Sequence, residues 1–306
     1  MSDFIMSSKG EEKGLKYLSL KCNEFKMPKI KKFWALYNTV WWWEWSKCLY
    51  PTRLDTYWQG CSHNCKYCYA RALLDFRGLW HPNNPKFIDL KEAYKIIAKE
   101  IPQGQITRLW WMTDCFQPVE KVHKITYNVL KAFNSCKKGY LIVTKSDLVA
   151  SDEYIEVLDK DLAHIQITIT STNDELWATY ENATRMSDRI KAVEKLWKLW
   201  YDVQIRLSPY IPQYVEINKI NDIKCDKIIV EFLRVNHWIK KWFNIDYSDW
   251  TYSEWWYMHL PLEKKIQLLS KIKKKEISVC EDVESHYKYW KEHFNFNSED
   301  CCNLRK

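Results

Sequence analysis

Short apolar runs alternate with longer amphipathic stretches over the central part of the chain. Runs rich in Ile, Leu and Val predict strands, whereas apolar residues spaced three and four apart predict helices. In residues 89–99, Leu90, Ala93, Ile96 and Ile97 share one helical face. The predicted strands are 53–57, 106–112, 140–144, 164–170, 203–207 and 227–233, and the predicted helices are 66–76, 89–99, 119–133, 152–158, 187–199 and 262–272.

Six strands that alternate with helices predict parallel βαβ units. Right-handed crossovers curl such a sheet into a partial (β/α)6 barrel, which binds ligands at the carboxyl ends of its strands. We therefore divide the chain into an N-terminal extension (residues 1–50), a core barrel (51–275) and a Cys-containing C-terminal tail (276–306).

Composition describes a protein outside the membrane. Charged residues make up 28% of the 306 residues, the mean hydropathy is −0.50, and no apolar run is long enough to span a bilayer. Residues 1–14 lack the apolar core of a secretory signal, so we predict a cytoplasmic protein without a membrane partner. The net charge of +8 permits a polyanionic partner, although lysine-rich solvated faces explain it more simply.

Tryptophan is abnormally frequent and glycine abnormally rare. The chain holds 18 Trp and 6 Gly, with no glycine after Gly139. Trp occurs where tight turns are expected, as in 41–43, 110–111 and 255–256, and Trp200 follows a predicted helix where a left-handed glycine is favoured. We hypothesise that UGA codons specify glycine in the source organism and are written here as tryptophan.

A cysteine-rich loop follows the first predicted strand. Cys61, Cys65 and Cys68 form a C-x3-C-x2-C run, which can direct three thiolates at one soft metal centre. Three thiolates leave one iron of a [4Fe–4S] cluster open for another ligand. The alternatives are zinc, with His63 as a fourth ligand, and free or disulfide-bonded thiols, which a chain without a secretory signal makes less favourable.

Polar residues follow several of the other predicted strands. The clearest cluster is Thr113, Asp114 and Cys115, although Asp114 could simply cap the next helix. Lys145 suits a carboxylate partner but could equally be a surface lysine. The remaining candidates are Ser171, which follows the fourth strand, and Arg206 in the fifth.

The motifs resemble those of the radical S-adenosylmethionine superfamily, in its spore photoproduct lyase-like (DNA repair photolyase-like) branch. The resemblance covers about residues 50–275. It rests on Gly-Cys-Ser-His-Asn-Cys-Lys-Tyr-Cys-Tyr-Ala-Arg (60–71), Thr-Asp-Cys-Phe-Gln-Pro-Val-Glu (113–120), Leu-Ile-Val-Thr-Lys-Ser-Asp (141–147) and Gln-Ile-Thr-Ile-Thr (166–170).

The resemblance implies a TIM-like partial barrel of the radical SAM type, with Cys61, Cys65 and Cys68 binding a [4Fe–4S] cluster. S-adenosylmethionine would chelate the open iron and be cleaved to a 5′-deoxyadenosyl radical, which abstracts hydrogen from a substrate. A reducing donor such as flavodoxin or ferredoxin is implied. Cofactor-binding residues would be Tyr67, Thr113, Asp114, Lys145, Ser171 and Arg206, and catalytic residues Tyr67 and Cys115.

One departure bears on the substrate. The lyase has a hydrogen-donating cysteine three positions before the aspartate of the second motif, where this chain has Trp111. Thymine-dimer repair is therefore not supported, and we expect a different substrate, with nucleic acid as a candidate. The alternative function is a non-catalytic, zinc- or cluster-binding nucleic-acid module.

Three further cysteines close the chain. Cys280, Cys301 and Cys302 could bind an auxiliary metal, but the adjacent pair can hardly reach one metal without a strained turn. We favour ordinary or capping cysteines here, and a structural role for Cys22, Cys48, Cys136 and Cys225.

Overall fold

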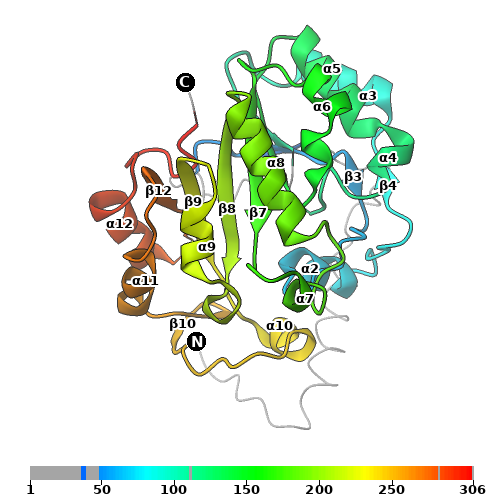
Figure 1. Ribbon diagram of the computed structural model, residues 1–306. Helices are drawn as coiled ribbons and strands as arrows, with labels where there is room; N and C mark the ends of the chain where they lie inside the picture. Colours follow the sequence, from blue (N-terminus) through cyan, green and yellow to red (C-terminus); the bar gives the residue numbers. More distant parts are fainter. Residues whose placement is uncertain (1–35, 39–47, 110–111, 282, 305–306) are drawn as a thin grey trace. The chain divides into compact units, whose positions relative to one another are not determined.

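The computed structural model describes residues 36–38, 48–109, 112–281 and 283–304, which all belong to one unit. Eight strands form its main sheet in the order β1-β2-β5-β6-β7-β8-β9-β12 (Figure 1). β1 (Leu36–Asn38) is antiparallel to β2 (Thr52–Leu54), and the other pairs are parallel. The parallel strands after β2 are β5 (Thr107–Leu109), β6 (Tyr140–Thr144), β7 (Ala163–Ile169), β8 (Asp202–Tyr210), β9 (Lys227–Phe232) and β12 (Glu276–Val279).

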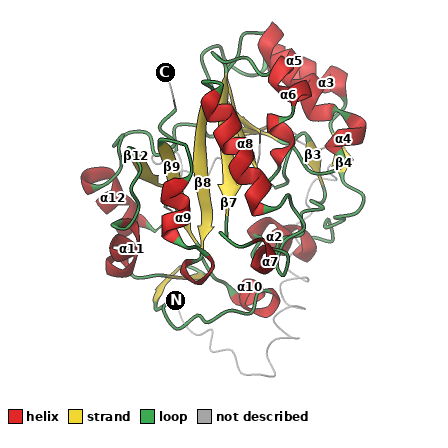
Figure 2. Ribbon diagram, viewed as in Figure 1, coloured by secondary structure: helices red, strands yellow, loops and turns green. Residues whose placement is uncertain are grey.

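Helices connect the parallel strands and cover the sheet (Figure 2). Helix α8, for example, packs on β7 and β8. Every residue of β6 and β7 is buried, as expected for strands covered on both faces. The helices are α2 (Tyr69–Phe76), α3 (Leu90–Lys99), α4 (Glu120–His123), α5 (Ile125–Ser135), α6 (Asp152–Val157), α7 (Asp174–Trp177), α8 (Met186–Lys198), α9 (Ile217–Asp222), α10 (His237–Trp242), α11 (Leu262–Leu269) and α12 (Glu284–His293).

The predicted fold class is confirmed, with two strands more than expected in the main sheet, the antiparallel β1 and the parallel β12. The edge strands β1 and β12 do not pair with each other in the described residues, so the barrel is partial. The pattern did not predict β12, because its four residues offer only Ile277 and Val279 as apolar positions. β12 begins at the boundary predicted for the C-terminal tail and pairs with β9, so residues 276–279 are part of the sheet.

The predicted helix over residues 119–133 is instead two helices. Lys124 interrupts it with a φ of 53°, and α5 begins directly afterwards. The cause is the buried carboxylate of Glu120, which accepts the N–H groups of Thr126 and Tyr127 at 3.0 and 2.9 Å. Glu120 also accepts hydrogen bonds from the hydroxyls of Tyr57 and Tyr154. Its carboxylate therefore caps α5 from inside the protein.

The face of the sheet that carries Arg206 is polar. Arg206 donates to Gln166 at 2.8 Å and pairs with Glu231 at 2.5 Å, and His164 contacts Asp202 at 2.6 Å. The C-terminal segment packs on this face, where Gln204 Nε2 donates to the carbonyl oxygen of Cys302 at 2.6 Å. The tail is thus held to the inner side of the sheet.

Two smaller two-stranded sheets complete the structure. β3 (Tyr57–Trp58) pairs with β4 (Lys86–Phe87), and β10 (Tyr252–Glu254) pairs with β11 (Tyr257–His259). Among the described residues, we find no helix with the length and apolarity needed to cross a bilayer.

Two tryptophans adopt backbone conformations that favour glycine. Trp200, just after α8, has a φ of 64°, and Trp255, in the turn between β10 and β11, has a φ of 56°. Their side chains are 78% and 79% exposed, so burial does not require an aromatic residue at either position. Both positions agree with the glycine hypothesis, whereas Trp41–Trp43, Trp110 and Trp111 lie outside the described residues.

We predict that Trp200→Gly stabilises the protein by about 1 kcal/mol, because glycine adopts the left-handed conformation without steric cost. Chemical denaturation measures the change. Trp197→Gly, within α8, is the matched control and should lower stability, since it removes a helical side chain. A Trp200→Gly protein no more stable than the parent would contradict strain at this position. Peptide masses of the native protein would show whether position 200 is glycine.

Candidate active site

The cysteine loop is built by tight turns between β3 and α2. Asn64 N–H donates to the carbonyl oxygen of Cys61 at 3.1 Å, and Cys68 N–H donates to that of Cys65 at 3.2 Å. A Cβ at Gly60, where φ is 145°, would lie 2.3 Å from the carbonyl oxygen of His81. Only glycine therefore fits where the chain enters the loop.

The three thiols line one cavity at the carboxyl ends of the strands, as the fold predicts. Tyr67, Thr113, Asp114 and Lys145 line the same cavity. The other side of the cavity comes from residues after β8 and β9, which include Ser208, Glu231 and Arg234. Segments far apart in sequence thus meet at one site.

Burial controls the protonation of the thiols. It raises the pKa of Cys61 to about 12, with Asp114 adding to the effect, and raises the pKa of Cys65 and Cys68 as well. The thiols are therefore protonated at neutral pH unless a positive centre binds them.

The donor set fits an iron–sulfur cluster in its chemistry. Three soft sulfur ligands face one cavity, and the positive charge of iron would offset the cost of buried thiolates. No three His, Cys, Asp or Glu side chains of the described residues already stand in a metal-binding geometry. Binding of a cluster would therefore have to draw the thiols together.

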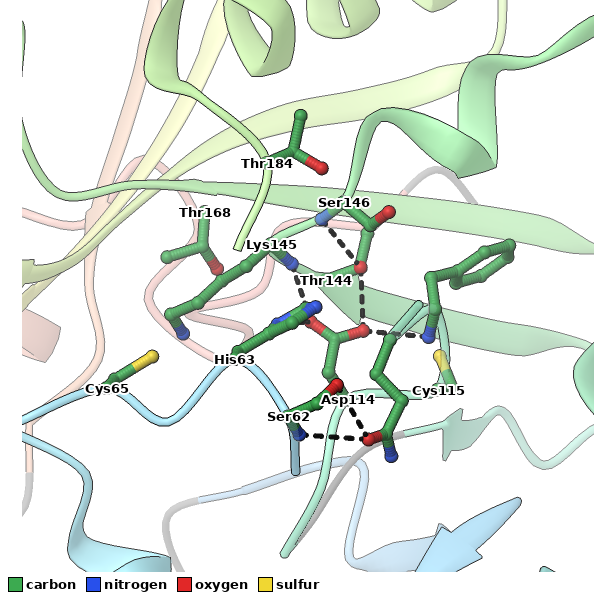
Figure 3. A network of polar contacts seen from close by, with 12 residues as sticks. Ser62, His63, Cys65, Asp114, Cys115, Thr144, Lys145, Ser146, Thr168 and Thr184 are labelled. Carbon is green, nitrogen blue, oxygen red and sulfur yellow. Dashed lines mark hydrogen bonds and ion pairs between the residues drawn. The ribbon is translucent and has the colours of Figure 1, made fainter. Parts of the chain in front are cut away.

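Asp114 joins the loop after β5 to the end of β6 (Figure 3). Its carboxylate accepts hydrogen bonds from Phe116 N–H at 2.8 Å, Thr144 Oγ1 at 2.8 Å and Lys145 N–H at 2.7 Å. His63 Nδ1 of the cysteine loop lies 3.5 Å from Asp114 Oδ2. Burial lowers the pKa of His63, so the imidazole is neutral beside this carboxylate.

Glu181 is a second buried carboxylate beside the cysteine loop. It accepts a hydrogen bond from the Tyr67 hydroxyl, and its Oε2 lies 3.5 Å from Cys65 Sγ. Arg189 Nη2 lies 2.5 Å from Glu181 Oε1, and both side chains are fully buried. Glu181 thus fixes the aromatic ring and one thiol of the loop from the segment between α7 and α8.

Most of the predicted site residues come together, and three do not reach the cavity. Cys115 is buried elsewhere, on the other side of Asp114 from Cys65 in Figure 3. The Ser171 hydroxyl donates to the carbonyl oxygens of Asn173 and Tyr214, and Arg206 bonds to Gln166 and Glu231. These three residues do not line the cavity. The catalytic role of Cys115 and the cofactor contacts of Ser171 and Arg206 therefore stay predictions.

Sequence reasoning missed Glu181 and the aromatic surroundings of Tyr67. The rings of Tyr180 and Phe243 lie 5.8 and 5.9 Å from the Tyr67 ring. No local motif marks these residues, because long-range packing alone brings them to the loop. On the cavity wall, Arg234 Nη2 lies 3.9 Å from Glu231 Oε1.

Comparison with known proteins gives a family-level match. A sequence profile of the Radical SAM superfamily matches residues 56–208, a range that includes the cysteine loop, Asp114 and Lys145. An uncharacterized protein of Methanocaldococcus jannaschii is 32% identical over 168 residues, which are 53% of this chain and 61% of that protein. The chain thus spans about three fifths of the curated relative that it matches.

Solved structures show the same fold. Spore photoproduct lyase complexed with dinucleoside spore photoproduct superposes with a TM-score of 0.54 and 13% identity, over 74% of this chain and 73% of that one. Streptococcus suis SuiB bound to precursor peptide SuiA gives a TM-score of 0.52 and 12% identity, over 94% of this chain and 57% of that one. At such identities the likeness concerns the fold.

We predict that Glu181→Gln lowers the free energy of unfolding by about 3–5 kcal/mol, because it leaves the buried Arg189 charge without its partner. Chemical denaturation at neutral pH measures the loss. The exposed Glu156→Gln is the control and should change stability by less than about 0.5 kcal/mol.

The same pair of proteins gives a pH test. Burial alone would raise the pKa of Glu181, but Arg189 and Lys145 outweigh it and lower the pKa. The stabilisation is therefore complete above the ordinary glutamate pKa of about 4.3 and is lost as the pH falls through the lower value of the folded state. The difference in the free energy of unfolding between the Glu181→Gln and Glu156→Gln proteins should therefore become smaller in acid. A difference that becomes larger in acid would contradict the ion pair.

Proposed function

Because this chain belongs to the Radical SAM superfamily, we propose that it is an enzyme that binds a [4Fe–4S] cluster and S-adenosylmethionine in the cavity described above. One observation carries the proposal: Cys61, Cys65 and Cys68 line the same cavity as Lys145 and Asp114. When bound, the cluster and S-adenosylmethionine supply the one-electron chemistry that removes a hydrogen atom from a substrate.

The chain's own residues would bind and orient the two cofactors and exclude water from the cavity. Cys61, Cys65 and Cys68 would hold the cluster. Lys145 lies with its Nζ 5.9 Å from the centre of the Tyr67 ring, where a carboxylate of the cofactor could pair with the ammonium group. Tyr67 is held in place by Glu181 and is buried, which favours an apolar contact with an adenine ring.

We propose nucleic acid as the substrate class. The guanidinium carbon of Arg234, on the cavity wall, lies 5.4 Å from the ring of Tyr69 and 5.5 Å from the ring of Tyr257. Arg71 lies 4.4 Å from the ring of Trp242. Aromatic rings beside guanidinium groups suit stacked bases and phosphates, and the net charge of +8 permits a polyanion.

The substrate class is tested by the formation of 5′-deoxyadenosine and by substrate products. Single-stranded DNA or RNA should increase cofactor cleavage by the anaerobically reduced protein and yield a modified nucleotide by mass spectrometry. Stimulation by peptides alone would overturn the nucleic-acid proposal while retaining the enzyme class. Nucleic-acid binding without any cofactor cleavage would favour the non-catalytic module.

We predict that Cys65→Ala abolishes 5′-deoxyadenosine formation after anaerobic reconstitution with iron and sulfide, because two thiolates cannot hold the cluster with one open iron. The product is quantified by chromatography under dithionite. Cys136→Ala, a half-buried thiol outside the cavity lining, should retain activity. A Cys65→Ala protein that still cleaves the cofactor would refute the ligand assignment.

We predict that Lys145→Met weakens S-adenosylmethionine binding roughly ten- to hundredfold, since a charge-assisted hydrogen bond contributes about 1.5–3 kcal/mol. Equilibrium binding to the cluster-loaded protein measures the Kd. Lys131→Met, on the exposed side of α5, is the matched control and should bind as the parent does. Equal affinities in all three proteins would exclude Lys145 from the cofactor site.

A further inference from the structure

Four cysteines from three separate segments meet on the inner side of the sheet. Cys48 precedes β2, Cys280 follows β12, and Cys301 and Cys302 lie in the C-terminal segment. All four belong to or pack against one core cluster, which includes side chains of β6 and β9. They do not line the cavity that holds the first three thiols.

The thiols lie beside one another and beside the buried guanidinium group of Arg108. Cys301 is hydrogen-bonded to both Cys280 and Cys302. Arg108 Nη1 lies 3.8 Å from Cys48 Sγ. Arg206, from the next-but-two strand of the sheet, adds a second positive charge that acts on Cys280 and Cys302.

Positive charge beside the thiols suits metal ligands. Thiolates are the form that binds metals, and each thiolate carries a negative charge. The guanidinium group of Arg108, with Nη1 3.8 Å from Cys48 Sγ, would stabilise such charge inside the protein.

An ordinary core cysteine of the same protein looks different. The Cys225 thiol donates to the carbonyl oxygens of Val203 and Lys227, each at 3.5 Å. Apolar packing explains such a thiol fully. It does not explain why four thiols from three separate segments gather in one place beside the buried guanidinium group of Arg108.

In place of the ordinary, capping or structural roles that we expected from the sequence, we propose that Cys48, Cys280, Cys301 and Cys302 form a second metal site, which takes Zn²⁺ or an iron–sulfur cluster through thiolate bonds. Each ligating thiol releases its proton on binding, and Arg108 and Arg206 offset the negative charge that remains. Like the first three cysteines, this group is not yet closed into a metal geometry within the described residues, so the metal would draw its ligands together.

Such a centre would anchor the C-terminal segment to the sheet. Residues 301 and 302 would be linked through the metal to the end of β12 and to the chain before β2. The C-terminal segment already contacts the chain before β2 through the Tyr50 hydroxyl, which donates to Asp300 at 2.5 Å. Metal binding contributes directly to folding when it links distant segments. The proposal is independent of the reaction at the first site.

The test uses the full chain with Cys61, Cys65 and Cys68 all changed to Ala, so that metal at the first site is excluded. This variant is reconstituted anaerobically with iron and sulfide, or with Zn²⁺, and bound metal is counted after desalting. We expect one zinc or one cluster per chain, and complete loss when Cys280→Ala and Cys302→Ala are added. Addition of Cys136→Ala instead should leave the metal in place.

A second measurement guards against misfolding of the Cys280 and Cys302 variants. Co²⁺ added to the triple-alanine protein should give a thiolate-to-cobalt charge-transfer band with all four proposed ligands intact. A triple-alanine protein that binds neither iron nor zinc and gives no such band would overturn the proposal. So would metal that survives removal of Cys280 and Cys302, or a metal-free protein with a Cys280–Cys301 disulfide.

Discussion

The site depends on the hydrogen bonds that the carboxylate of Asp114 accepts. This carboxylate holds the end of β6 through Thr144 and Lys145, and it stands beside His63 of the cysteine loop. A buried carboxylate with several N–H and O–H donors is strongly oriented, because each donor would otherwise be unsatisfied. The position of Lys145 relative to the thiols therefore depends on one side chain that follows β5.

Parallel topology explains why much of the site could be predicted from sequence. Cys61, Asp114 and Lys145 each follow a strand that the apolar pattern identified, and parallel strands place their carboxyl ends at one edge. Local order along the chain was thus enough to bring these residues together. The chemical role of each still rests on the family motif and stays a prediction.

The features that sequence did not predict all come from contacts between distant segments. Glu181 is an unremarkable acidic residue until Arg189 and Tyr67 enclose it. The helix breaks at Lys124 because the side chain of Glu120 is buried and caps the next helix. Residues 276–279 form β12 because they pair with β9. The presence of Cys48 beside Cys280, Cys301 and Cys302 could not be foreseen either, since Cys48 lies far from the other three in sequence. Periodicity and motifs carry no information about such partners.

The four hydrogen bonds of Glu120 have an evolutionary consequence. Its carboxylate satisfies two phenols, Tyr57 and Tyr154, as well as two backbone N–H groups at the start of α5. Replacement of Glu120 alone would leave the buried hydroxyls of Tyr57 and Tyr154 without an acceptor. A substitution at any of the three positions therefore favours compensating substitutions at the others. Positions 57, 120 and 154 are therefore expected to covary among homologues, and this covariation would be a record of folding rather than of chemistry.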